Sequence, residues 1–404
     1  MSHNLNRSIL LVLAMDLPAK ASLAVVTLFL IREMPVEEYS QFTLLVSICS
    51  ITFGITLNSI NKIYIIEYES YKIHNIRGSL FANQFIIILF LFVIALLLSS
   101  YTIVIIGIFV FLVGKCVFQF TQSDLSRRLS FKWYSSLELM RSVLYAGAIL
   151  GLFYYYNIEL TAVTPLLIQG VLALLVGAPF FFILGLYVGI WRPIGGTRLI
   201  ARFLAGKHLY LFGYWTLLAL FSEVDVLSLS YLSDELQLAT YGASFRYYAL
   251  VLLALGAAHN VLLPGIAKAE DKQSLTEIFR KHRTLSFFAF FAILTGAIGS
   301  YWAIPIVDGG KYPQSFGVLQ ILLVSSIISF SCSPYVNLLL KFGEFRFLFF
   351  LISICLALNI TLNFIFIPIL GAYGAAATTL LAYAVLNGSI YARAARILRS
   401  PSDA

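Results

Sequence analysis

The feature that most constrains this chain is the recurrence of long apolar segments along almost its whole length. Twelve segments are bounded by charged or turn residues, and each is long enough to cross about 30 Å of hydrocarbon as a helix. Sixty per cent of the 404 residues are hydrophobic and 11% are charged, whereas a soluble domain carries roughly a quarter charged residues. The sequence predicts an all-α integral membrane protein with about twelve transmembrane helices, at residues 8–31, 38–60, 79–100, 102–121, 136–156, 162–190, 209–231, 240–265, 284–306, 315–340, 347–369 and 374–392.

The distribution of Lys and Arg predicts the orientation of these helices. With the N-terminus in the cytoplasm, 21 of the 27 basic residues fall in cytoplasmic loops or ends, and only Arg32 and Lys311 fall on the opposite side. Basic residues favour the cytoplasmic face, and one miscounted helix would exchange the sides of every later loop. Both termini are therefore predicted to be cytoplasmic. The net charge of +8 belongs largely to these loops, so we expect no nucleic acid partner.

The loops exclude several classes of enzyme. No predicted outer loop exceeds about ten residues, so any chemistry would take place inside the bundle. The four cysteines lie in apolar segments without redox or metal-ligand spacing, and the chain has no phosphate-binding glycine loop. The sequence predicts no catalytic residue, no metal site and no cofactor. We expect the histidines other than His259, including His282, to be solvated.

A faint internal repeat divides the chain. Tyr39 and Tyr241 are 202 residues apart, and each follows a predicted helix and a short acidic outer turn. A repeat of six helices preserves orientation, so its halves would be related by a pseudo-two-fold axis along the membrane normal. The predicted domains are a six-helix bundle at 1–190, a basic cytoplasmic linker at 191–208, and a second six-helix bundle at 209–404.

Ionisable residues deep in the membrane are candidates for function because each costs about 2.5–3.5 kcal/mol to insert. Asp16 and Lys20 lie four residues apart, on one face of the first predicted helix and near its middle. They form either a self-neutralising pair or part of a wet cavity. Pro18 lies between them and frees a backbone carbonyl, which favours the cavity.

Two later helices carry further deep charges. Arg246 has no acid one turn away on its own helix, so it needs an anionic ligand or a partner such as Asp225. Glu223 and Asp225 are two residues apart, so they cannot both face one cavity, and we expect one to have a packing partner. The sequence does not distinguish which.

Another group of charges lies nearer the cytoplasmic surface. Glu138 and Arg141 are three residues apart, and Lys115 belongs to the preceding helix. Snorkelling of these side chains to the interface explains them as well as a functional role does. Together with Lys20 and Arg246, the two basic residues give the membrane interior four cations, which suits a cavity that attracts a phosphate or pyrophosphate group.

The second half of the chain resembles a known family. The similar stretches are residues 223–232, 239–247, 262–264, 318–323, 358–363 and 371–377. They resemble the polysaccharide transporters of the multidrug/oligosaccharidyl-lipid/polysaccharide exporter superfamily, which includes the O-antigen flippases. These motifs are moderately specific for the superfamily and poorly specific for substrate. The tetrad of Asn359, Asn363, Gly371 and Gly374 is interpreted as structural, because small residues allow close helix packing.

The resemblance implies a flippase that moves an undecaprenyl-pyrophosphate-linked oligosaccharide across the bacterial inner membrane by alternating access. It implies a cationic cavity at Lys20 and Arg246, with Lys115 and Arg141 nearer the cytoplasmic mouth. Asp225 matches the acid of the family's seventh helix. Asp16, Asp225 and Glu138 are candidates for ion coupling or charge pairing. The implied partners are the lipid-linked oligosaccharide, the bilayer and proteins of polysaccharide assembly.

Two other functions stay open at this point. One is export of drugs or metabolites by a multidrug transporter of the same superfamily, against which the surplus of cations argues. The other is a membrane enzyme such as a polysaccharide polymerase or an acyltransferase, against which the short outer loops argue.

Overall fold

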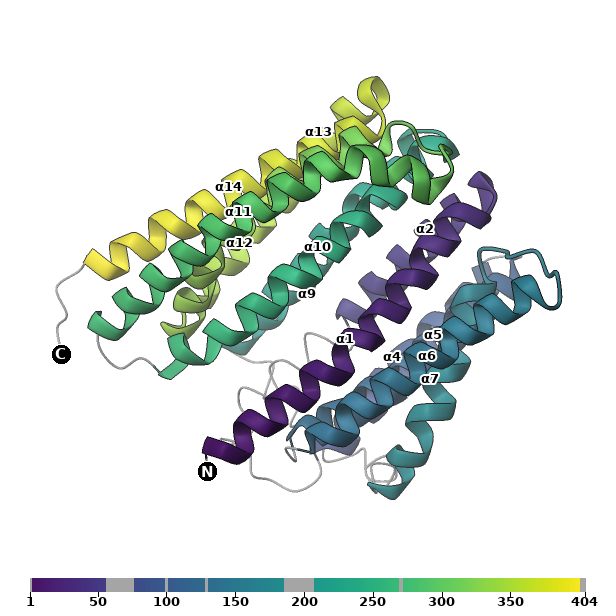
Figure 1. Cartoon of the computed structure of the whole chain (residues 1–404), viewed down its shortest axis with the longest axis horizontal. Helices are drawn as coiled ribbons and strands as arrows, with labels where there is room; N and C mark the ends of the chain where they lie inside the picture. Colours follow the sequence, from purple (N-terminus) through teal and green to yellow (C-terminus); the bar gives the residue numbers. More distant parts are fainter. Residues whose placement is uncertain are drawn as a thin grey trace. The chain divides into compact units, whose positions relative to one another are not determined.

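The structure is a computed structural model that describes residues 2–55, 76–98, 101–127, 130–184, 207–268 and 272–399. The elements in these ranges are twelve α-helices (Figure 1). They are α1 (Ser2–Glu33), α2 (Val36–Phe53), α4 (Ile76–Leu98), α5 (Thr102–Arg127), α6 (Phe131–Tyr154), α7 (Thr164–Ile183), α9 (Lys207–Leu232), α10 (Glu235–Lys268), α11 (Lys272–Asp308), α12 (Ser315–Lys341), α13 (Phe345–Leu370) and α14 (Ala372–Arg399).

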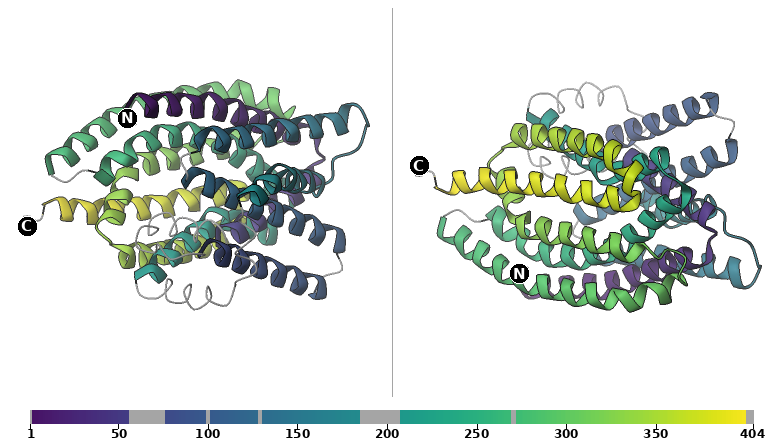
Figure 2. Two further views of the ribbon diagram at one scale, coloured as in Figure 1. Left: turned by 90° about the horizontal axis from the view of Figure 1, so that it is seen from below. Right: turned by 90° about the horizontal axis from the view of Figure 1, so that it is seen from above.

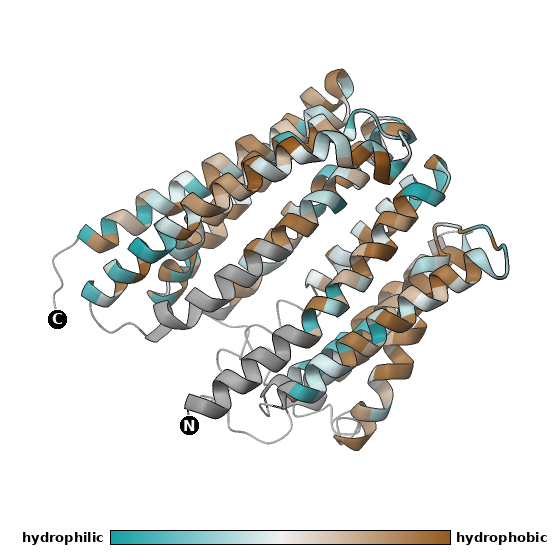
Figure 3. Cartoon of the chain, in the orientation of Figure 1, coloured by the Kyte–Doolittle hydropathy of each residue, from teal (hydrophilic) through white to brown (hydrophobic). Residues whose placement is uncertain are grey.

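Hydrophobic composition explains why these segments are helices of this length. Within the described residues, eight helices are long and apolar enough to cross a membrane, namely α5, α6, α7, α9, α11, α12, α13 and α14. A shorter apolar stretch, Gln84–Leu97, lies in α4. Backbone groups inside a bilayer must bond within their own segment, and a helix satisfies this requirement. Hydrophobic residues dominate the middle of α13, and hydrophilic residues gather at the C-terminal end of α14 (Figure 3).

The predicted segments coincide with the observed helices, and the differences lie at their ends. The prediction for α11 began at residue 284, but the helix begins at Lys272 and includes a charged first part. Residues 54 and 55 continue α2 as a π-helical turn, and the predicted segment 38–60 then runs beyond the described residues. Most of the predicted linker 191–208 also lies outside them.

The chain divides into two compact units, Met1–Thr216 and Leu217–Ala404, which we call the N-terminal and C-terminal units. In the N-terminal unit, α5 packs along α7, α1 packs along α6, and α6 also contacts α7. Figure 2 draws the helices of this unit in purple, blue and teal. Apolar side chains from α5, α6 and α7, including Phe118, Leu137 and Val176, form a shared core. The boundary between the units falls inside α9, so the predicted division at 191–208 stays a prediction.

The C-terminal unit repeats the packing of the N-terminal unit. Its fourth helix α12 packs along its sixth helix α14, as α5 packs along α7. The pairs α13–α14, α11–α12 and α10–α12 likewise correspond to α6–α7, α4–α5 and α2–α5. This agreement supports the internal repeat that Tyr39 and Tyr241 indicated.

One hydrogen bond recurs at the same place in both units. In the N-terminal unit, the backbone N–H of Ala162, two residues before α7, donates to Glu38 Oε2 at 2.6 Å. In the C-terminal unit, the N–H of Ala372, the first residue of α14, donates to Gln237 Oε1 at 2.9 Å. Glu38 and Gln237 are both the third residue of their helix, α2 and α10. Each side chain therefore satisfies a donor that the start of its unit's last helix leaves free.

The turn before α14 requires glycine at two positions. Gly371 has φ of 55°, and a Cβ there would lie 2.3 Å from Gln237 Oε1. A Cβ on Gly374 would lie 2.5 Å from the carbonyl oxygen of Phe366 on α13. The interpretation of this glycine pair as structural agrees with the geometry.

Candidate functional site

Charged residues from three helices of the N-terminal unit meet in its interior. Asp16 and Lys20 come from α1, Lys115 from α5, and Glu138 and Arg141 from α6. Asp16 interacts electrostatically with Lys20 and Glu138, and Lys115 interacts with Arg141 and Glu138. The five residues therefore form one connected group, which we call the charge cluster. It exists because α6 packs against both α1 and α5.

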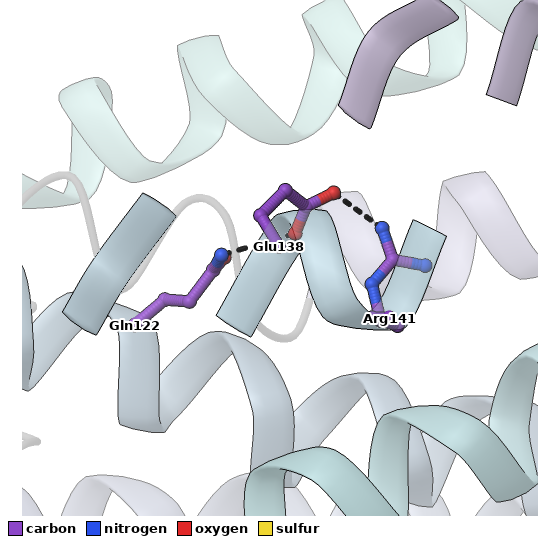
Figure 4. Close-up of polar contacts among 3 residues, drawn as sticks. All are labelled: Gln122, Glu138 and Arg141. Atoms are coloured by element: carbon purple, nitrogen blue, oxygen red, sulfur yellow. Dashed lines mark hydrogen bonds and ion pairs between the residues drawn. The ribbon is translucent and has the colours of Figure 1, made fainter. Parts of the chain in front are cut away.

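Arg141 of this cluster is buried and only 3% exposed. Its Nη2 donates to Glu138 Oε1, and the guanidinium lies 5.1 Å from the ring centroid of Phe118 (Figure 4). Glu138 Oε2 accepts a second hydrogen bond, of 3.0 Å, from Gln122 Nε2 on α5. Snorkelling of Arg141 to the membrane surface, which the sequence left open, is therefore wrong: the guanidinium is buried against an aromatic ring and a carboxylate.

Several buried polar atoms around the cluster have no hydrogen-bond partner among the described residues. They are Nε and Nη1 of Arg141 and Oγ of the adjacent Ser142. Buried polar groups in folded proteins are nearly always satisfied by protein or ordered water. These unsatisfied groups indicate that the region around Arg141 is built to receive polar atoms.

The helix that carries Asp16 runs without a break through Pro18. The hydroxyl of Ser22 donates to the carbonyl oxygen of Pro18 at 2.9 Å. Pro18 itself is exposed, and Asp16 and Lys20 are half-buried one helical turn apart.

The C-terminal unit contains a second polar group, built around Asp225 of α9. Asp225 is 3% exposed. Its Oδ2 accepts hydrogen bonds from the hydroxyl of Tyr241 on α10, at 2.5 Å, and from the hydroxyl of Thr379 on α14. Its Oδ1 accepts a bond of 2.9 Å from Asn363 Nδ2 on α13. Four helices thus contribute to one buried carboxylate, which we call the Asp225 site.

Further amide and hydroxyl groups surround this site. Asn363 Nδ2 also donates to Asn359 Oδ1 at 2.8 Å, and Asn359 Nδ2 donates to Thr379 Oγ1 at 3.3 Å. The hydroxyl of Thr378 contacts Asn363 Oδ1. The two asparagines therefore do more than allow close packing. They are polar partners of the acid, and this part of the structural interpretation of the tetrad is corrected.

The partners of Asp225 are all neutral, which corrects the suggested pairing with Arg246. Among the described residues, the acid bonds with Tyr241, Thr379 and Asn363 and with no cation. Arg246 is half-buried on α10. Glu223 is also half-buried, so Asp225 is the more deeply buried member of the acidic pair.

Sequence reasoning missed three residues of these sites. Gln122, Tyr241 and Thr379 each hydrogen-bond to a buried carboxylate. Tyr241 was noted for the repeat alone, and a single Gln or Thr in a long apolar segment carries no signal of its own. Only the packing of the helices brings these groups to Glu138 and Asp225.

The described residues contain no group of three or more His, Cys, Asp and Glu that could hold a metal ion. His282, predicted to be solvated, is buried in α11, and its Nε2 lies 2.9 Å from the carbonyl oxygen of Phe330 on α12. That prediction is wrong, because α11 begins before His282 and packs this face of the helix against α12.

No protein-family model matches the sequence, and no curated protein matches it. Solved structures match over nearly the whole chain. The lipid II flippase MurJ in an inward closed conformation is 15% identical, with a TM-score of 0.72, covering 94% of this chain and 87% of that one. An inward-facing multidrug resistance MATE family transporter of the MOP superfamily is 11% identical, with a TM-score of 0.70, covering 96% and 98%.

A mutant of the Vibrio cholerae MATE transporter VcmN is 13% identical, with a TM-score of 0.65, and the match covers 98% of both chains. At such identities the likeness establishes the fold. The chain is a multi-pass, all-α membrane protein with the fold that a lipid flippase and multidrug transporters share.

Proposed function

We propose that the chain is a flippase that moves an undecaprenyl-pyrophosphate-linked oligosaccharide, such as an O-antigen repeat unit, across the bacterial inner membrane. The observation that carries the proposal is the buried guanidinium of Arg141, with Lys115 beside it, inside a membrane-protein bundle. Buried cations are costly unless an anion offsets them. A pyrophosphate group that enters the bundle would offset the positive charge of Arg141 and Lys115.

The cations proposed to bind the substrate in the N-terminal unit are Lys20, Lys115 and Arg141. Arg246, in the C-terminal unit, is a further proposed substrate-binding residue. The charge cluster holds three of these cations and two acids, Asp16 and Glu138, so it keeps a surplus of positive charge. Asp124 of α5 is also buried, but it lies about 180° around the helix from Lys115 and so does not face the cluster. The fold of a lipid II flippase agrees with a lipid-linked substrate.

The Asp225 site is the best candidate for ion coupling. A buried carboxylate with only neutral partners gains a great deal from a proton or a small monovalent cation, because either offsets the charge that burial penalises. Hydroxyl and amide oxygens of Thr379, Asn359 and Asn363 lie around it, and such oxygens suit a hard cation. Asp16 and Glu138 are weaker candidates, because cations already lie beside them.

A second candidate function is export of cationic drugs or metabolites, as a MATE transporter fold allows. The observation that favours it is Asp225, a buried acid whose hydrogen-bond partners within the described ranges are all neutral. The cations of the charge cluster argue against it, because they would repel a cationic substrate.

The test is translocation in sealed vesicles that contain the purified protein. We expect a fluorescently labelled undecaprenyl-pyrophosphate-linked oligosaccharide to cross between leaflets, faster when a proton or sodium gradient is imposed. A cationic dye should not be transported under the same conditions. Dye transport without movement of the labelled lipid would overturn the proposal and support drug export.

A further inference from the structure

Within the described residues, the guanidinium of Arg141 has one hydrogen-bond partner and two nitrogen atoms that hydrogen-bond to nothing. Nη2 bonds to Glu138, whereas Nε and Nη1 have no hydrogen-bond partner among the described residues. The side chain is 3% exposed, so these donors are withdrawn from solvent. A buried donor left without an acceptor destabilises the folded state. The arrangement therefore leaves Arg141 short of acceptor atoms.

The geometry of the guanidinium decides how an anion could supply the missing acceptor atoms. Phosphate and carboxylate groups bind arginine most strongly through two parallel N–H donors. One such pair is Nε with Nη2, and the other is Nη1 with Nη2, so Nη2 belongs to both. Glu138 holds this shared nitrogen through one oxygen. Nη2 carries two N–H groups, one for each pair, so Glu138 occupies one of the two strong positions, and its negative charge disfavours a phosphate at the other while it stays in place.

Glu138 is held in this position by a neighbour from another helix. Its second oxygen accepts the 3.0 Å hydrogen bond from Gln122, so both carboxylate oxygens are engaged (Figure 4). The side chain is nevertheless 25% exposed, far more than that of Arg141. Glu138 thus lies between the exposed edge of the cluster and the buried guanidinium.

The exposed edge at Glu138 is not the apolar face of α6. The exposed apolar residues Met140, Val143 and Leu144 lie about 140–240° around the helix from Glu138, at about 100° per residue. Glu138 therefore points away from the face suited to lipid. On this side the cluster also carries Lys115, which interacts electrostatically with both Glu138 and Arg141.

We infer that Glu138 is a resident counter-ion that occupies an anion site on Arg141, and that a phosphate or pyrophosphate group binds there by displacing it. Return of Glu138 to Nη2 then expels the anion, so the site binds its ligand without retaining it. This inference rests on the proposed function for the identity of the natural ligand, a pyrophosphate-linked lipid. The exchange itself concerns only the anion and the residues of the cluster.

The experiment measures binding of inorganic pyrophosphate to the full-length protein in detergent, by equilibrium dialysis with radiolabelled pyrophosphate. Glu138→Gln removes the competing charge and should bind about ten-fold tighter than wild type, because a close charge pair shielded from water is worth at least one such factor. Arg141→Gln should lose binding, and Arg141→Lys should keep part of it because lysine lacks the fork. The double variant Glu138→Gln/Arg141→Gln should behave like Arg141→Gln.

The chain offers a matched control in the C-terminal unit. Glu344 pairs with Arg393 at 2.8 Å, and its side chain is 24% exposed. Glu344→Gln makes the same change of charge at a glutamate of similar exposure outside the cluster, whose arginine partner is 39% exposed, and it should leave pyrophosphate affinity unchanged. Glu138→Asp keeps the charge but shortens its reach, so its affinity should lie between those of wild type and Glu138→Gln. This variant tests the exchange if Glu138→Gln yields no folded protein.

The results separate the inference from the proposed function. Equal affinity in wild type, Glu138→Gln and Glu138→Asp, or no binding by any of them, overturns the exchange. If the affinities follow the expected order but the labelled lipid does not cross vesicles, the anion site stands and the flippase proposal fails. If the lipid crosses but the pyrophosphate affinities do not follow the expected order, the flippase proposal stands, and Glu138 is not a counter-ion that the anion displaces.

Discussion

At the scale of single residues, the two units place their buried charges in opposite settings. Within the part of the chain that the structure describes, Arg141 is paired with an acid and remains short of acceptors, whereas Asp225 accepts three hydrogen bonds from neutral partners. The first setting suits an anionic ligand and the second suits a cation. A transporter that couples an anionic substrate to a cation gradient needs both.

Replacing Asp225 by Asn tests the ion-coupling role. The amide group of Asn would face a hydroxyl or amide donor, so we expect the free energy of unfolding to fall by about 1–3 kcal/mol. We also expect translocation to lose its dependence on the ion gradient. Thermal unfolding and vesicle transport measure the two effects. Glu223→Gln, two residues away on the same helix, is the control, and a gradient response as strong in Asp225→Asn as in this control would exclude Asp225 from coupling.

Removing a proposed substrate-binding cation tests whether these cations bind an anionic substrate. Lys20→Ala or Arg246→Ala should abolish export of the surface polysaccharide while the protein remains in the membrane, because the pyrophosphate would lose a counter-charge. Polysaccharide staining and immunoblotting of membranes measure the two quantities. Lys281→Ala is the control, since Lys281 is 66% exposed and pairs with Glu277 on the surface of α11. Normal polysaccharide in both test variants would remove the case for a cationic cavity.

At the scale of helices, close packing of backbones fixes the N-terminal unit. A Cβ on Gly114 of α5 would lie 2.1 Å from the carbonyl oxygen of Gly170 on α7. A Cβ on Gly170 would lie 2.6 Å from the Cα of Phe111. Small residues let membrane helices approach this closely, and dispersion contacts then hold them together.

Gly114→Ala should therefore separate α5 from α7 and lower the free energy of unfolding by at least about 2 kcal/mol. Gly147→Ala and Gly151→Ala on α6 are matched controls, because a Cβ at either position meets no atom within 4 Å. The unfolding midpoint of the purified variants measures the difference. A Gly114→Ala protein as stable as the controls would show that the close contact does not hold the two helices.

The helices themselves were largely predictable, and their polar contacts were not. Length and hydrophobicity mark a membrane helix in one dimension, so all twelve segments were found. The Asp225 site joins residues up to 154 positions apart, and nothing in the chain near Thr379 or Tyr241 distinguishes them from ordinary residues of an apolar helix. Asn359 and Asn363 were noticed through family resemblance, but their contact with Asp225 depends on how α13 packs.

At the scale of the whole molecule, the repeat explains why two units of such different chemistry share one architecture. Four helix pairs pack in the same way in both units, and near the start of the last helix a backbone N–H donates the same hydrogen bond to Glu38 or Gln237. Duplication of a six-helix unit preserves this framework. The residues inside each copy could then diverge into a charge cluster and an acidic site.

The orientation of the chain remains a prediction from its charges, and it can be tested at three positions. Lys281 and Lys341 are predicted to lie on the cytoplasmic side, and Lys311 on the outside. Helix α11 would carry the chain from Lys281 out to Lys311, and α12 would carry it back to Lys341. Single cysteines at these positions, in a background where the four native cysteines are replaced by Ser, should react differently with a membrane-impermeant maleimide. In intact spheroplasts we expect labelling of Lys311→Cys alone, and after lysis labelling of all three. The inverse pattern would mean that the chain has the opposite orientation in the membrane, with most of its basic loops outside. Labelling of adjacent positions from one side would mean that α11 or α12 does not cross the membrane, and the count of twelve spans would then fail.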